Sequence, residues 1–168
     1  MSLLAVKNYI QTVVGGTTIP ASVTKWKTVK GYRQMPKETV LGSKAIVVFG
    51  DVDGSERRKT FPIGSGAKEV VWKFPLAIHA GATDEGTGGD QFDVLVWAIM
   101  NAIRTANTGI PINDPLTNEE SILHAIGENI DIKSLTPIQI APDGEGQASQ
   151  VKFEATLRVE VKEWLENA

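Results

Sequence analysis

His79 and the carboxylates that follow it are the side chains of this sequence best suited to chemistry. The glycine-rich segment after His79 and the start of the next element carry four acidic residues: Asp84, Glu85, Asp90 and Asp93. An imidazole with nearby carboxylates can ligate a divalent cation or act as a general base. Asp90, however, is placed to cap a helix, and Asp93 stabilises the same helix N-terminus through its dipole. We therefore expect no catalytic residue, metal site or cofactor; the alternative is a metal-dependent enzyme centred on His79.

Other motifs that carry chemistry are incomplete. The run Asp51-Val52-Asp53-Gly54 resembles a calcium loop, but the EF-hand needs its glycine at the sixth position and a glutamate at the twelfth, and here the glycine is fourth. Gly64-Ser65-Gly66 and Gly86–Gly89 lack the Gly-Lys-Ser/Thr that completes a phosphate-binding loop. The chain has no Gly-x-Ser-x-Gly elbow and no cysteine, which excludes disulfides and thiolate catalysis. The sequence predicts a protein that is not an enzyme.

A basic segment near the N-terminus offers a second kind of chemistry, contact with a polyanion. It interleaves cations with aromatic rings at Lys25, Trp26, Lys27, Lys30, Tyr32 and Arg33. A groove for single-stranded nucleic acid needs this combination. Residues 1–40 hold six basic residues against Glu38 alone, a net charge of +5, so the remainder carries −8 to give the total of −3. An acidic body repels phosphate, so the segment is expected to contact a neighbouring subunit, to contact DNA, or to be a solvated loop.

The first half of the chain is expected to form one helix and three strands. Residues 3–14 have apolar side chains at helical spacing and end at Gly15-Gly16. Residues 15–42 are rich in turn formers and are predicted to be an irregular basic arm. Lys44–Phe49 is predicted to be a strand that returns through a turn as a hairpin over Arg57–Ile63. Lys68–Ala80 alternates and is a further strand, in which Pro75 indicates an edge position or a bulge.

The second half supplies the strongest helix and further strands. A loop over Gly81–Gly89 leads to a helix over Gln91–Thr105, capped by Asp90. Its buried stripe is Phe92, Leu95, Val96, Ile99, Met100 and Ile103, widened by Trp97. Residues 107–116 are a loop, and residues 117–126 fit either a helix with a capping box or a strand. Residues 127–141 are expected to hold one or two short strands separated at Pro137.

The C-terminal segment has the clearest pattern of the chain. Apolar and polar residues alternate strictly over residues 150–164, which is typical of a strand with one dry and one wet face. Such a strand spans about 35 to 40 Å, roughly twice the usual length. An element of this length either crosses its own domain or pairs with a neighbour.

Composition and element order define the expected fold. A chain of 168 residues with 42% apolar and 22% charged residues is typical of one globular domain. No apolar run approaches the ~20 residues of a membrane span. Because the later strands can return by hairpins, we predict a single α+β domain over residues 1–168. It has a largely antiparallel sheet, two or three helices packed on one face and a long C-terminal strand.

Several of these features together resemble a known family. They are a strand containing an apolar-proline pair, a Gly/Asp loop, the helix after Asp90, the segment Ser121–Ile130 and the closing strand Ala155–Leu165. Over roughly residues 68–165 the chain resembles the tail-terminator and minor tail proteins of long-tailed bacteriophages. The resemblance also implies that Ser121–Ile126 is a strand.

The resemblance implies a structural virion protein of a phage or prophage, present in the virion tail and in the host cytoplasm during assembly. Such a subunit forms a ring, usually a hexamer, that ends the tail tube. Its partners would be copies of itself, tail-tube proteins and head-tail connector proteins, with non-specific DNA contact in a channel. No catalytic residue or cofactor comes with the family. A ring requires one patch to meet a different patch on the next copy; the alternative is a monomer whose long strand crosses its own domain.

Overall fold

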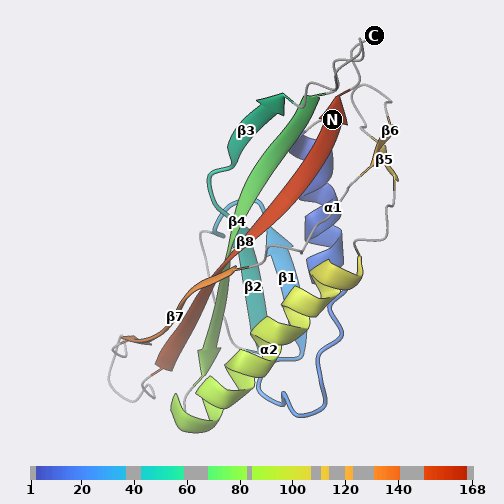
Figure 1. The fold of residues 1–168 in the computed structure, drawn as a ribbon. Helices are drawn as coiled ribbons and strands as arrows, with labels where there is room; N and C mark the ends of the chain where they lie inside the picture. The colour runs from blue at the N-terminus through green and yellow to red at the C-terminus, as the bar shows by residue number, and fades with distance from the viewer. Residues whose placement is uncertain are drawn as a thin grey trace.

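The alternating C-terminal segment forms the longest strand, β8 (Gln150–Leu165). In the computed structural model, which describes residues 3–36, 43–58, 68–82, 85–106, 111–113, 120–122, 131–140 and 150–165, β8 is antiparallel to β4 (Lys68–Ala82) along the whole of β4. From Val151 to Val161, every second side chain is buried. The predicted strand is confirmed, and it pairs along its length with β4 of the same sheet (Figure 1).

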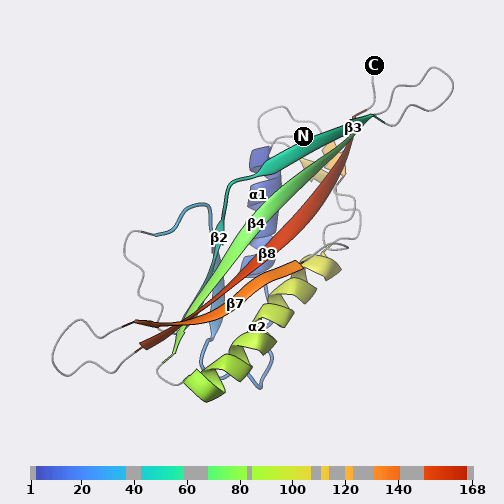
Figure 2. The same ribbon diagram turned by 60° about the vertical axis from the view of Figure 1, so that its left-hand side comes forward.

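Two helices cover one face of the sheet. They are α1 (Leu3–Gly15) and α2 (Glu85–Thr105), and both lie on the same side of the strands in Figures 1 and 2. Their inward side chains share one core with alternate residues of the central strands, among them Phe74, Leu76 and Leu157. The hydrophobic effect therefore fixes which face of each strand meets the helices. The predicted α+β class and the helix over residues 3–14 are confirmed.

The main sheet has six strands. Its order is β1 (Thr28–Tyr32), β2 (Lys44–Phe49), β4, β8 and β7 (Asp131–Ile140), with β3 (Asp53–Arg58) also beside β4. Among the strand pairs that the structure describes, only β1–β2 is parallel, so the sheet is largely antiparallel as predicted. A separate antiparallel pair joins β5 (Pro111–Asn113) to β6 (Glu120–Ile122). Within the described residues, no helix has the length and apolar character to cross a membrane.

The predicted hairpin is wrong for the described residues, because β2 and β3 do not pair with each other; residues 59–63 of the predicted return strand lie outside the described part. Both pair with the same edge of β4, one after the other (Figure 2). Pro75 lies between the two paired stretches, and its carbonyl accepts a hydrogen bond of 2.8 Å from the Gly50 amide. The N–H and C=O of one strand residue point to the same side, so the missing proline N–H faces the gap between β2 and β3. Pro75 therefore sits in a central strand, not at an edge.

Helix α2 begins at Glu85, so the predicted cap at Asp90 is wrong and the predicted loop is helical from residue 85. The close packing of Gly88 against β8 explains why the helix includes this glycine-rich turn. A Cβ atom on Gly88 would lie 3.0 Å from Phe153 Cζ, so the first turn approaches β8 more closely than other residues allow. This tertiary packing offsets the low intrinsic helix propensity of glycine. Residues 83–84 lie outside the described part.

The predicted irregular arm over residues 15–42 is also corrected. It contains β1, and Val23, Trp26 and Val29 are buried in the core. Residues 37–42 lie outside the described part.

Three short-range predictions in the second half have mixed outcomes. The predicted loop over residues 107–116 contains strand β5, so that prediction is wrong for residues 111–113. Within residues 117–126, residues 120–122 form a strand, as the family resemblance implies; the remainder, with His124, lies outside the described part. Residues 131–140 form one strand that continues through Pro137 with an irregularity between Ile132 and Ser134. The edge position of β7 in the sheet permits this proline.

Candidate interaction surfaces

Trp26 is a core residue and not a stacking platform. Its side chain is 1% exposed, and its indole Nε1 donates a hydrogen bond of 2.9 Å to the Gly81 carbonyl. Its ring meets Phe92 and Phe153 edge-on, at centroid distances of 6.0 and 6.2 Å. Edge-to-face packing of this kind stabilises an aromatic cluster beyond its burial alone. Burial removes Trp26 from the predicted contact surface.

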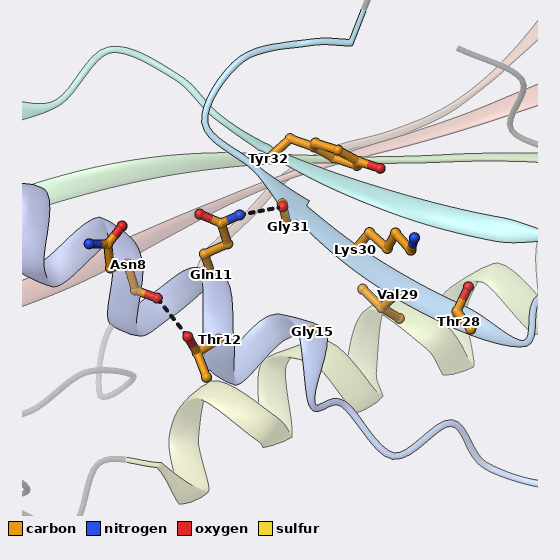
Figure 3. Close-up of a pocket in the computed structure, with 9 residues that line it drawn as sticks. All are labelled: Asn8, Gln11, Thr12, Gly15, Thr28, Val29, Lys30, Gly31 and Tyr32. Carbon is orange, nitrogen blue, oxygen red and sulfur yellow. Dashed lines mark hydrogen bonds between the residues drawn. The ribbon is translucent and has the colours of Figure 1, made fainter. Parts of the chain in front are cut away.

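The four predicted cations do not form one groove. The segment before β1 is held on α2 by Gln91, whose Oε1 accepts hydrogen bonds from the Thr24 and Lys25 amides at 2.9 and 3.0 Å. Lys27 is exposed, and its amide bonds to the Ser43 carbonyl. Figure 3 shows Lys30 on the side of β1 away from α1, with Val29 on the other side.

Arg33, by contrast, is directed to α1. It is exposed and its guanidinium donates a hydrogen bond to the Asn8 side chain. The predicted contact residues are thus divided between the two faces of the sheet.

An open groove runs between α1 and the edge strand β1 (Figure 3). Gln11 crosses it, and its Nε2 donates a hydrogen bond of 2.9 Å to the Gly31 carbonyl. A Cβ atom on Gly31 would lie 2.9 Å from Gln11 Cγ, so glycine is needed for this approach. An exposed strand edge is a template for pairing with other chains. Gln11 occupies one of its acceptors, which limits this edge as an assembly site.

His79 lies near the C-terminal end of β4, on the face opposite the helices. Its strand neighbours Ile78 and Ala80 are in the core beneath the helices, and successive strand residues point to opposite faces. The His79 side chain is directed to Glu154 on β8, with Nδ1 3.5 Å from Glu154 Oε2. That separation exceeds a hydrogen bond, and Nδ1 has no hydrogen-bond partner among the described residues. Lys152 Nζ lies 3.8 Å from the same carboxylate oxygen.

Burial lowers the pKa of His79, the positive charge of Lys152 lowers it further, and Glu154 partly opposes both by raising it. Desolvation disfavours the charged imidazolium, so the neutral form is the stable one in the folded protein.

Among the described side chains, the His79 site predicted as the enzymatic alternative is not assembled; Asp84 and the side chain of Glu85 lie outside them. Asp90 and Asp93 lie on α2, which covers the other face of the sheet, and both are exposed. Among the described residues, no group of three or more histidines and carboxylates is arranged to hold a metal ion. His79 has one carboxylate and one ammonium group beside it instead. This arrangement fits a structural histidine in a mixed-charge sheet face.

The outer face of α2 carries two of the three exposed large apolar side chains among the described residues; the third is Met35. Trp97 is 54% exposed and Val94 is 37% exposed. The prediction that Trp97 widens the buried stripe is therefore wrong, whereas the other six members of that stripe are buried. Trp97 follows Val94 by three positions, so both lie on one outward stripe. The Arg104 guanidinium lies 5.1 Å from the Trp97 ring centroid, in a cation–π contact.

Beside Val94 and Trp97 is an open groove of roughly 490 Å³ between α2 and the end of α1. Its walls include Val13, Pro20 and Ala98 as well as the two exposed side chains. We call Val94, Trp97 and this groove the α2 surface. Sequence periodicity could not find it, because Trp97 lies at the margin of the apolar stripe and only the position of α1 decides whether it is covered.

Comparison with known proteins gives limited information. No family model matches the sequence, and no curated protein matches it. Among solved structures, the chain is similar to one described as "Virion of native gene transfer agent (GTA) particle". That comparison covers 91% of this chain and 84% of that chain, with 12% sequence identity and a TM-score of 0.43. Similarity of this degree assigns no function to the chain, so the evidence for function is its own exposed surfaces.

Proposed function

We propose that this chain is a structural subunit that assembles with copies of itself into a ring and performs no catalysis. The observation that carries the proposal is the α2 surface, where a tryptophan is more than half exposed beside an open groove. Burying a large aromatic side chain stabilises a contact, and exposed apolar surface next to a groove is typical of a protein–protein interface. The two alternatives lack a comparable observation. For the metal-dependent enzyme, no metal-binding cluster is found among the described residues. For the nucleic-acid groove, Trp26 is buried.

We further propose that the ring is a tail terminator, or another minor tail component, of a long-tailed phage or prophage. This part rests on the resemblance over residues 68–165 and on the long closing strand paired within an α+β sheet. In this role the ring ends the tail tube and joins it to the head-side connector. The hexamer, the tail-tube partner and the contact with DNA in the channel belong to the same proposal.

Light scattering after size-exclusion chromatography tests self-assembly. We expect the wild-type protein to form a species of about six times the 18.1 kDa chain mass, seen as rings by electron microscopy. Trp97→Ser should shift this species toward the monomer. Met35→Ser is the matched control, because Met35 is also exposed, at 43%, but lies far along the chain from α2. A wild-type protein that stays monomeric at high concentration contradicts the proposal.

A tube-length assay tests the tail-specific part. A tail-tube protein from the same genome is polymerised with and without the ring protein, and tube lengths are measured by electron microscopy. We expect added protein to stop elongation and to be visible at one tube end. If rings form but neither bind tubes nor shorten them, the terminator role is contradicted and the proposal of self-assembly still stands.

A further inference from the structure

Among the side chains that the structure describes, the sheet face away from the helices carries more cations than acids, although the chain as a whole is acidic. Strand alternation and register place five cations on this face: Lys30, Lys44, Lys73, Lys152 and Arg158. Glu154 and Glu160 are the acidic residues of this face among the same described side chains. We call this face the open sheet face, because no described helix lies against it.

The apolar residues of β2 on the open sheet face are buried, because Ile46 is 4% exposed and Val48 is 8% exposed. Ile46 and Val48 of β2 alternate with the core residues Ala45, Val47 and Phe49, and they lie outside the core cluster shared with the helices. Ala77 is the register partner of Val48 on β4. The surface that a partner meets is therefore formed mainly by the cationic side chains, and it is suited to a partner that presents acids.

The α2 surface presents such acids beside its apolar side chains, with Arg104 over the Trp97 ring near the C-terminal end of the helix. Asp90 and Asp93 are exposed and precede Val94 and Trp97 on the same side of the helix. The inward side of α2 packs on the sheet, where Phe92 stacks on Phe153 with a centroid distance of 5.4 Å. Consequently the outer side of α2 and the open sheet face point in opposite directions from the core. One molecule therefore presents two different and complementary patches.

We infer that the α2 surface of one copy docks on the open sheet face of the next copy, an inference that rests on the proposed self-assembly. Contact between two different patches is heterologous, which produces a closed ring or an open filament and not a simple two-fold dimer. A second copy covers Val94 and Trp97 and neutralises the cationic face in the same contact. Nucleic acid would neutralise the open sheet face but would leave the two apolar side chains exposed, and the net negative chain would oppose it.

Two variants, each damaged in one patch, test the inference. The helix variant is Asp93→Lys with Trp97→Ser, and the sheet variant is Lys30→Glu with Lys44→Glu. All four side chains are exposed, so the fold should survive, which circular dichroism checks. We expect each variant alone to run as an 18.1 kDa monomer by light scattering. An equimolar mixture should give a species of twice that mass, because one intact α2 surface meets one intact open sheet face and growth then stops.

A matched control reverses two cations on the helix side of the molecule. Lys7→Glu with Arg33→Glu changes the charge by the same amount as the sheet variant, and Arg33 contacts α1. We expect this control to assemble like the wild type. If it loses assembly as the sheet variant does, general charge and not the open sheet face is responsible, and the inference is overturned.

The remaining outcomes separate the inference from the proposed function. If the wild type assembles and both interface variants still assemble, the docking inference is wrong and the ring proposal stands. A wild type that never assembles overturns both. Retention of a duplex DNA fragment at low salt, lost in the sheet variant while rings persist, would identify nucleic acid as the occupant of the open sheet face and overturn docking by a second copy.

Discussion

At the scale of single residues, His79 on the open sheet face makes the stability of the folded protein depend on pH. Its side chain is 8% exposed, and burial followed by the charge of Lys152 holds its pKa below the ordinary value of 6.5. As the pH falls below about 6.5, the His79 imidazole therefore becomes protonated in the unfolded chain while it stays neutral in the folded protein. Stability conferred by neutral His79 is complete above that value and is lost as the pH falls toward the lower pKa of the folded state.

His79→Gln should remove this acid-side loss. We expect the urea midpoint of the variant to change less than that of the wild type between pH 7.5 and pH 5, since glutamine does not titrate. Lys152→Met should act in the same direction but more weakly, because it removes only the second cause of the lowered pKa. An equal loss of stability in the wild type and His79→Gln would show that other groups control the acid response.

Two neighbouring glycines of α2 should respond in opposite ways to alanine. A Cβ atom on Gly88 would meet Phe153 at 3.0 Å and Ala82 at 3.2 Å, and Phe153 is held between Trp26 and Phe92. We expect Gly88→Ala to destabilise the protein by about 1 to 3 kcal/mol through overpacking. At Gly89 the nearest contact is 3.9 Å, so Gly89→Ala should stabilise the helix by up to about 1 kcal/mol. Thermal unfolding of both variants makes the comparison, and equal effects would contradict it.

At the scale of elements, the segment before β1 depends on α2 for its position. Local sequence predicts an irregular basic arm, yet Gln91 accepts two backbone hydrogen bonds from residues 66 and 67 positions away in the chain. Buried Trp26 adds a hydrogen bond and two aromatic contacts. No local pattern reports such distant partners, so sequence periodicity could not predict the ordered packing of this segment.

Gln91→Ala should loosen this segment without unfolding the sheet. Loss of its two accepted hydrogen bonds, which are partly exposed, should cost about 1 kcal/mol. Hydrogen exchange at the Thr24 and Lys25 amides should accelerate, while exchange in β4 and β8 should stay unchanged. Gln34→Ala is the control, because Gln34 is exposed. Unchanged exchange at both amides would show that Gln91 does not hold the segment.

At the scale of the whole molecule, charge and apolar burial should contribute to assembly in separable ways. Salt screens the attraction between the acids of the α2 surface and the cations of the open sheet face, because the Debye length falls from about 10 Å at 0.1 M to about 3 Å at 1 M. Over that range we expect the concentration needed for assembly to rise by about tenfold, equivalent to about 1.4 kcal/mol. Light scattering across a dilution series at each salt concentration measures it. Stronger assembly at high salt would show that apolar contact alone holds the ring.

Patterns in the amino-acid sequence were sufficient to predict the elements whose signal is local. The alternation of residues 150–164 produced β8, and apolar side chains at helical spacing produced α1 and most of α2. These patterns suffice because burying one face of a strand or helix depends only on spacing along the chain. They also fixed the α+β class, since the strand-rich order leaves the helices one face to cover.

Which elements contact one another depends on the three-dimensional packing of the chain. This packing paired β2 and β3 with β4 and not with each other, started α2 at a glycine-rich turn, buried Trp26 and left Trp97 exposed. It also gathered Lys30, Lys44 and Lys152 from three separate strands onto one face. Such outcomes depend on packing between residues distant in sequence, whose free energy local spacing does not encode.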